Sequence, residues 1–283
     1  MLHSSGRVLC ALFLLPAGAD ALAQGPPPAD KSGYHLFDPT PRELRREMSA
    51  DRPDATESPY TVDAGGVQLE MSFAEYSYDR DDGRDAHSWS LAPVNLKLGL
   101  TNNADLQFLL SPWDAESGEV VEESSGFAGA GLRLKVNLHG NDSGGFALGL
   151  LPFILFPSGN DEAGPQEVEG GFAIPMAVEL PHGWGLGWQV QVEWLRDEAD
   201  EGYDTLFSHT VVFGHDIVGE LAGYIEFIGE VFIDGPGGYR PSLSAGLTSA
   251  LSPDAQLDLG VVIGLDDDQT DDLRVFSGLT LRF

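Results

Sequence analysis

Between Val67 and Phe283, apolar and polar residues alternate along many short stretches of the chain. Successive side chains of a strand point to opposite faces, so this alternation predicts strands with one apolar and one polar face. Pro93 interrupts the pattern and predicts a bulge before the second strand. The expected strands cover 67–74, 94–100, 106–110, 130–138, 146–156, 172–180, 184–194, 205–215, 221–231, 243–251, 257–263 and 273–283.

The connections between these strands alternate in length. Long connections lie near 78–88, 113–125, 157–168, 196–205, 232–241 and 265–272, and short ones near 101–104, 139–145, 181–183, 216–220 and 252–254. A membrane barrel with both termini in the periplasm has long outer loops and short inner turns, whereas a soluble sandwich has no reason to alternate them. The pattern therefore predicts an all-β fold: a transmembrane antiparallel up-and-down β-barrel of about 12 strands.

The last strand, Leu273 to Phe283, is apolar on one face and ends on an aromatic residue. The closing strand of an outer-membrane barrel needs one face for lipid and one for a polar lumen. We therefore expect three partners: outer-membrane lipid, lipopolysaccharide, and the barrel-assembly machinery, which would engage the strand that ends at Phe283.

The N-terminus has the features of a secretory signal. Arg7 precedes a short apolar run, and Ala21-Leu22-Ala23 forms a small-x-small cleavage site. The run is too short to span a bilayer as a helix, which needs about 20 apolar residues. Residues 1–23 are thus expected to be a signal peptide of the general secretory route, and the mature protein is expected in the outer membrane of a Gram-negative cell. Cys10, the single cysteine, lies within the signal.

Residues 24–66 form a separate periplasmic segment in this interpretation, with the barrel spanning 67–283. The segment is rich in proline, which excludes it from a sheet, and Pro41–Met48 is expected to form a short helix capped by Thr40. The charges that follow could pair inside a lumen, so the segment is expected to close or line the periplasmic mouth. A disordered periplasmic tail is the alternative.

The chain has 45 acidic and only 15 Lys and Arg residues, a formal net charge of −30. This charge argues against nucleic-acid binding, which requires Lys and Arg to neutralise phosphates. Many of the acidic residues fall in the long loops, where they are expected to keep the surface soluble. The string Asp79–Gly83 lacks EF-hand spacing, so no metal site and no cofactor are predicted.

Charged residues on the polar strand faces are the candidates for lining the lumen. Lys97, Arg133, Lys135, Arg274 and Arg282 come from the second, fourth and twelfth strands, and Glu179, Glu193, Glu226, Glu230 and Asp258 from the sixth, seventh, ninth and eleventh. A closed barrel would place the two groups on opposite walls, with Arg133 and Lys135 facing Glu193 and Glu226. Such opposed charges could set the selectivity of a pore, or they could fill a narrow barrel as salt bridges.

Sequence signatures of catalysis are missing. There is no Gly-x-Ser-x-Gly, phosphate loop or His-Glu-x-x-His, and Ser208 and His209 would face opposite ways on a strand. The chain is therefore not expected to be an enzyme.

Two stretches resemble a known family. Tyr34–Leu44 and the string Asp51-Arg52-Pro53-Asp54-Ala55-Thr56-Glu57-Ser58-Pro59 are similar to proteobacterial proteins described as transporters of the phenol meta-pathway degradation family. The resemblance continues through most of the mature chain. It implies an outer-membrane barrel that passes small solutes, with aromatic or other hydrophobic organic compounds among the candidates. A structural or adhesion barrel that uses its acidic loops is the alternative.

Overall fold

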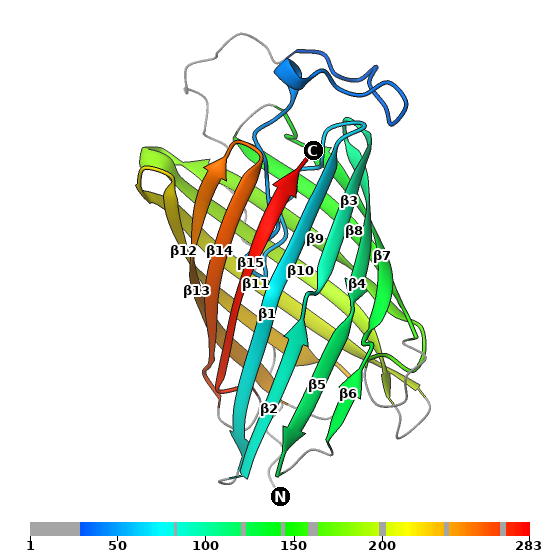
Figure 1. The fold of residues 1–283 in the computed structure, drawn as a ribbon, viewed down its shortest axis with the longest axis vertical. Coiled ribbons are helices and arrows are strands. Elements are labelled where there is room, and N and C mark those ends of the chain that lie inside the picture. The colour runs from blue at the N-terminus through cyan, green and yellow to red at the C-terminus, as the bar shows by residue number, and fades with distance from the viewer. Residues whose placement is uncertain are drawn as a thin grey trace, which may run out of the picture.

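The structure is a computed structural model that describes residues 29–81, 84–119, 123–142, 145–157, 164–197, 202–234, 238–266 and 270–283. Its described part is an antiparallel sheet that closes on itself, because β1 pairs with β15. The strands tilt around a lumen, and the C-terminus lies at the end of β15, on the same side as the N-terminal segment (Figure 1). The predicted fold class, a 12-stranded barrel, is confirmed.

Fifteen strand segments occupy the twelve positions of the ring. The closed ring runs β15-β14-β13-β12-β11-β10-β9-β8-β7-β4-β3-β1, while β2, β5 and β6 extend β3, β4 and β7. The segments are β1 Val67–Asp81, β2 Arg84–Leu91, β3 Val94–Thr101, β4 Ala104–Ser111, β5 Trp113–Gly118, β6 Ser124–Gly126, β7 Gly129–His139, β8 Phe146–Phe156, β9 Glu169–Leu180, β10 Trp184–Asp197, β11 Gly202–Val218, β12 Leu221–Phe232, β13 Tyr239–Ser252, β14 Ala255–Gly264 and β15 Leu273–Arg282.

The two faces of the wall differ in chemistry as the alternation predicts. Outward side chains such as Leu243, Leu259 and Ile263 are apolar and about half exposed. The inward face is polar and buried, and its fully covered side chains include Gln68, Lys97, Asp105, Gln107 and Lys135. Apolar outside and polar inside is the pattern of a barrel that faces lipid.

Aromatic side chains lie on the outer wall toward both ends. Trp184 and His215 have ring centroids 4.5 Å apart near the short turns, and Tyr76 and Trp89 lie 4.7 Å apart toward the long loops. Amphipathic aromatic rings at both levels form the girdles expected at the two membrane interfaces. The chain is thus an outer-membrane barrel in a lipid environment.

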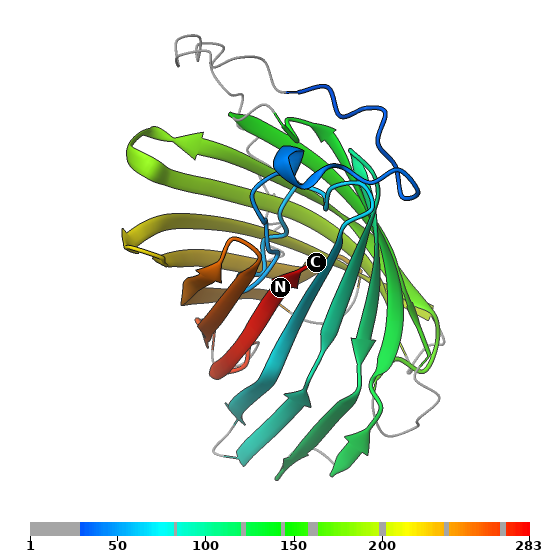
Figure 2. The same ribbon diagram turned by 45° about the horizontal axis from the view of Figure 1, so that its top comes forward.

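The wall is interrupted at one level in three neighbouring strands. β1 pairs with β3 along Val67–Met71 and with β2 beyond Ala74, because Ala92 and Pro93 break the strand between them. Pro112 separates β4 from β5, and Phe127 with Ala128 separates β6 from β7. Beyond these breaks, β2, β5 and β6 form a short sheet at the long-loop end (Figure 2).

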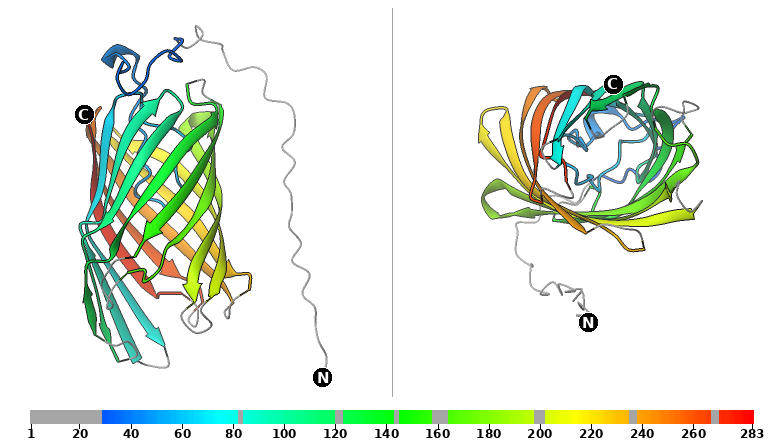
Figure 3. Two further views of the ribbon diagram at one scale, coloured as in Figure 1. Left: turned by 90° about the vertical axis from the view of Figure 1, so that its right-hand side faces the viewer. Right: turned by 90° about the horizontal axis from the view of Figure 1, so that it is seen from below.

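This short sheet leaves the wall incomplete. β7 pairs with β8 as far as Ala130 and Phe156, but among the described residues no strand pairs with the outer edge of β6. The side view in Figure 3 shows the extension leaning away from the rest of the barrel. The ring is therefore closed at the short-turn end and open on one side toward the long loops.

Some sequence expectations were wrong in detail. Much of the predicted loop 78–88 is strand, because the ladder between β1 and β2 continues to the pair Asp81 and Arg84. Likewise β5 and β6 lie within the predicted loop 113–125. The helix expected over Pro41–Met48 is only the 3₁₀ turn Arg42–Leu44 (η1), without a side-chain cap. Another 3₁₀ turn, Pro181–Gly183 (η2), fills a predicted short connection.

No helix within the described ranges is long and apolar enough to cross a membrane. The predicted signal peptide, residues 1–23, lies outside the described residues.

Candidate functional site: the occupied lumen

Residues 29–66 precede the barrel and occupy its short-turn end. The beginning of the segment, with the turn η1, lies over the mouth, and the chain then enters the ring of strands (Figures 1 and 3). We call residues 29–66 the plug segment, its turn 52–57 the tip, and the two flanking stretches 46–51 and 58–63 the stem. Stem and tip contact different levels of the inner wall, as their hydrogen bonds show.

At the barrel mouth the plug segment is held by ion pairs. Arg46 donates to Asp142 at 3.0 Å and lies 3.4 Å from Asp63, and Lys31 lies 3.0 Å from Asp63 and also pairs with Asp142. Arg46 further donates to the carbonyl oxygen of Asn102 at 3.1 Å. Because Asp142 and Asn102 belong to two short turns, these contacts tie the segment to the rim.

The second stretch of the stem, 58–63, lies directly against the wall. Val62 N donates to Asp105 at 2.9 Å, and Asn137 donates to the carbonyl oxygen of Pro59 at 2.9 Å. At Gly99 of β3 a side chain would collide with the carbonyl oxygen of Asp63. Glycine is thus required there for the segment to approach the sheet.

Below the mouth, Asp51 joins two buried lysines. Lys135 Nζ lies 2.6 Å from Asp51 Oδ1, and Lys97 pairs with both Asp51 and Glu70. The lysine side chains are only 1–2% exposed, and Ser58 N also donates to Asp51 at 2.9 Å. Burial alone would raise the pKa of the Asp51 carboxyl, but the ammonium groups of Lys135 and Lys97 hold that pKa below its usual value.

The tip is held by a carboxylate of the opposite wall. Glu226 of β12 accepts from Ala55 N at 2.9 Å, from Thr56 N at 2.8 Å and from Thr56 Oγ1 at 2.7 Å. Thr56 Oγ1 also lies 2.6 Å from Thr210 Oγ1 of β11. Glu226 therefore acts as a clamp for the backbone of the tip.

Two guanidinium groups complete the contacts of the tip. Arg52 forms a forked pair with Asp258 of β14, with Nη2 at 2.8 Å and Nε at 3.2 Å, and donates to Ser72 at 2.5 Å. Gly278 of β15 leaves the space that this guanidinium occupies. On the other side of the tip, Arg133 of β7 pairs with Glu57. Bidentate pairing of the kind made by Arg52 is geometrically specific as well as strong.

Asp54 differs from its neighbours because no basic side chain among the described residues pairs with it. Burial raises the pKa of its carboxyl well above the usual value, and the nearby carboxylates of Glu226, Asp51 and Glu57 raise it further. The tip thus contains one buried carboxyl group without a basic partner among the described residues, and its surroundings favour the protonated, neutral form.

The remaining predicted lumen residues lie farther from the tip. Glu179 lines a cavity at the mouth, and Arg282 lies at the rim, 2.7 Å from Asp254. Glu193 accepts from Gln191 and faces the long-loop half with Glu230, while Arg274 lines a cavity beside the tip. The basic residues Lys97, Lys135 and Arg133 contact the plug segment rather than an open bore.

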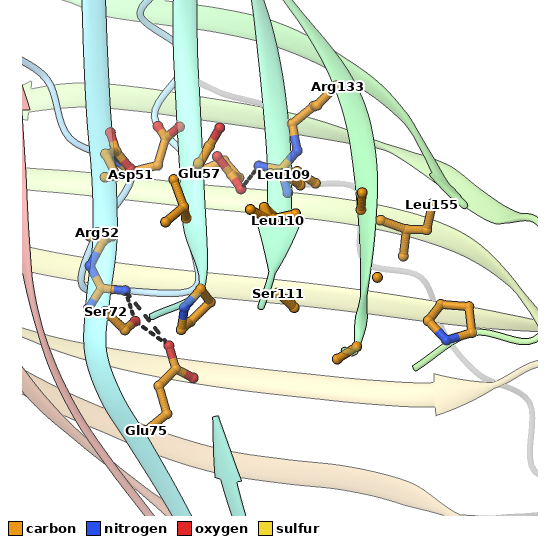
Figure 4. Close-up of a pocket in the computed structure, with 18 of the residues that line it drawn as sticks. Asp51, Arg52, Glu57, Ser72, Glu75, Leu109, Leu110, Ser111, Arg133 and Leu155 are labelled. Atoms are coloured by element: carbon orange, nitrogen blue, oxygen red, sulfur yellow. Dashed lines mark hydrogen bonds and ion pairs between the residues drawn. The ribbon is translucent and has the colours of Figure 1, made fainter. Parts of the chain in front are cut away.

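Two cavities flank the tip on its long-loop side. The first, about 370 Å³, is lined by Arg52, Asp54, Glu57, Glu75 and Arg133, and by apolar residues of the interrupted wall, Pro93, Val94, Leu109, Leu110, Ala128, Ala130, Leu155 and Pro165. Its charged and apolar sides face one another in Figure 4. The second, about 210 Å³, lies between the tip, Glu226, Arg274 and Phe276. Arg52, Asp54 and Glu75 line both cavities.

The first cavity passes through the level of the wall. Leu109 and Leu155 belong to the inward-facing set of their strands, whereas Leu110 and Ala130 belong to the outward-facing set, as their burial alternation indicates. Inward and outward residues can line one cavity here because the strands are interrupted beside it. The cavity therefore connects the lumen with the open side of the barrel.

Sequence reasoning missed several residues of the site. Glu70, Ser72, Gln189 and Thr210 hold the plug segment, and their period-two positions on inward faces were the available signal. Arg46 and Asp63 carried no comparable signal, because no strand pattern covers them. Within the described residues there is no group of three or more His, Cys, Asp or Glu side chains that could hold a metal ion.

Comparison with known proteins agrees with this architecture. The family described as "Putative MetA-pathway of phenol degradation" matches residues 50–283. An outer-membrane channel from Pseudomonas putida F1 is 14% identical with a TM-score of 0.61, covering 83% of this chain and 100% of its own. The β domain of the Bordetella autotransporter BrkA is also 14% identical, with a TM-score of 0.50, covering 76% and 98%. No curated protein matches the sequence.

Proposed function

The chain belongs to the family described as "Putative MetA-pathway of phenol degradation", and from this premise we propose that it is an outer-membrane channel for small solutes that have an apolar part. The observation that carries the proposal is the first cavity, which is bounded by the tip on one side and by the interrupted wall on the other. Such a cavity favours the passage of solutes over a structural or adhesion role, because neither of those roles requires space inside the barrel.

The plug segment sets what the channel can pass. Its stem fills the lumen near the short turns with paired charges, so the barrel is not an open porin. Solutes would pass around the tip, whose contacts are fewer. The volume of about 370 Å³ suits a molecule the size of a single aromatic ring with substituents. No catalytic role is proposed, and lipopolysaccharide and the assembly machinery remain proposed partners.

A flux experiment tests the proposal. The full chain is reconstituted in liposomes loaded with hexyltrimethylammonium or hexanesulfonate, two six-carbon ions whose permanent charge slows passage through lipid. We expect at least one of them to leave faster than from protein-free liposomes. Leu155→Trp, which fills the cavity from the lumen side, should slow this flux severalfold.

Leu259→Trp is the matched control, because Leu259 faces outward on β14 and lines neither cavity flanking the tip. It should leave the flux unchanged. If neither ion leaves faster than from protein-free liposomes, the channel proposal is wrong. If both Trp variants slow the flux equally, the cavity is not the route.

A further inference from the structure

The acidic and basic side chains that line the two cavities differ in how many of their polar atoms already have hydrogen-bond partners. Arg52, the basic side chain that lines both cavities, uses its nitrogens in hydrogen bonds within the protein. Arg52 gives Nε and Nη2 to Asp258 and Nη1 to Ser72, and its guanidinium lies 5.8 Å from the ring centre of Phe276. Arg133 pairs with Glu57, and its Nε is buried out of reach of a solute. Arg52 therefore has no nitrogen without an acceptor, whereas Arg133, whose Nη2 has no hydrogen-bond partner among the described residues, lines the first cavity and not the second.

The carboxylate of Glu75, by contrast, has one oxygen that accepts no hydrogen bond from the described residues. Glu75 uses Oε1 to accept from Ser72, with Arg52 Nη1 3.8 Å away, while Oε2 has no hydrogen-bond partner among the described residues. In Figure 4 that second oxygen points away from both neighbours. The Glu75 side chain is 29% exposed, compared with 17% for Arg52. Asp54 also lines both cavities and has no basic partner among the described residues, but its raised pKa favours the neutral carboxyl.

More acidic than basic side chains line the second cavity. The second cavity is lined by the carboxylates of Asp54, Glu75 and Glu226 and by the two cations Arg52 and Arg274. Arg52 is already neutralised by Asp258, which lies 2.8 Å away and is fully covered. Arg274 lines the second cavity but not the first, so it does not lie where the two cavities meet. Glu75 is therefore the carboxylate, where the two cavities meet, that keeps one oxygen without a partner among the described residues.

We propose that Glu75 makes this channel selective for small apolar molecules with a cationic head group, such as an alkyl or aryl ammonium. The apolar body would lie against Leu109, Leu110 and Leu155, and the positive head would meet Glu75 Oε2 while passing the tip. An anionic head of the same size would meet the Glu75 carboxylate and be repelled. This inference rests on the proposed channel function and names the solute class of the same route.

The test compares the two ions of the flux experiment in the same liposomes. Hexyltrimethylammonium should leave at least about fivefold faster than hexanesulfonate, because one contact between unit charges at about 4 Å is worth about that factor even in water. Glu75→Gln should remove most of this preference while the flux of hexanesulfonate stays or rises.

Glu116→Gln is the matched control, since Glu116 lines a separate small cavity in the extension and loses the same charge. It should keep the preference. If both ions pass equally, if hexanesulfonate passes faster, or if Glu116→Gln acts like Glu75→Gln, the head-group inference is wrong although the channel stands. If neither ion passes, the channel proposal itself has failed.

Discussion

The stem and the tip of the plug segment are adjacent in sequence but are held in different ways. Asp51 of the stem is enclosed by two lysines that are almost fully covered, and every one of these three groups has an opposite charge beside it. The tip is held by hydrogen bonds to Glu226 and by two arginine pairs, with cavities around it and with Asp54 lacking a basic partner among the described residues. Saturated buried pairs resist rearrangement, whereas a partly satisfied contact surface can adapt to a solute. The stem thus fixes the plug segment in the barrel, and the tip forms a cavity wall that can adapt to a solute.

The largest expected effect comes from breaking the stem. Asp51→Ala would leave Lys135 buried with Glu57 Oε2 as its nearest acidic atom, 3.9 Å away, and would leave Lys97 with Glu70 alone. Removing one partner of a buried ion pair typically costs about 3–5 kcal/mol. We expect a matching loss of thermal stability and a higher ion conductance in planar bilayers.

Asp38→Ala is the control for this change, because Asp38 is an exposed acidic residue of the same segment. It should alter neither stability nor conductance. A stable Asp51→Ala protein with unchanged conductance would show that the stem does not depend on its central carboxylate.

A smaller effect should follow from loosening the tip alone. Glu226→Gln keeps an acceptor oxygen for the tip but loses the negative charge, so part of the roughly 1.5–3 kcal/mol that a hydrogen bond to a charged group is worth, about 1 kcal/mol or more, should be lost. We expect faster amide hydrogen exchange at Ala55 and Thr56 and unchanged exchange at Val62, which donates to Asp105. Equal acceleration at all three amides would mean that stem and tip open as one unit.

The smallest expected effect is a pH dependence confined to the tip. The pKa of Asp54 is raised above 3.8, first by burial and then by Glu226, so the docked tip binds more protons than the free tip. Docking therefore weakens as pH rises above 3.8, until Asp54 is ionised in both states. The pKa of Asp51 is shifted downward, so its contribution is lost only when pH falls below 3.8.

Amide exchange at Thr56 should therefore accelerate relative to Val62 as pH rises above 3.8, after correction for intrinsic rates. Asp54→Asn, neutral at every pH, should remove that difference. A difference that persists in Asp54→Asn would assign the pH dependence to another group.

The sequence predicted the inner and outer faces of most strands, because a period of two is a local property of the chain. Arg133, Lys135, Glu226 and Asp258 were predicted to face the lumen, and they meet the plug segment there. Their partners could not be predicted. Asp51 lies 84 positions from Lys135, and Arg52 lies 206 positions from Asp258. Which charges meet across a lumen depends on how deep the segment enters and where it turns.

The interruptions of the wall were also only partly predictable from the sequence. Pro93 and Pro112 are visible in the sequence as residues that cannot continue a ladder. Only the strand register places the breaks in β2–β3, β4–β5 and β6–β7 at one level, with the cavity beside them. The sequence by itself therefore determined the strands, their faces and the membrane setting. The tertiary structure decided which charges are neutralised and which remain for a solute, because that depends on distances between segments far apart in the chain.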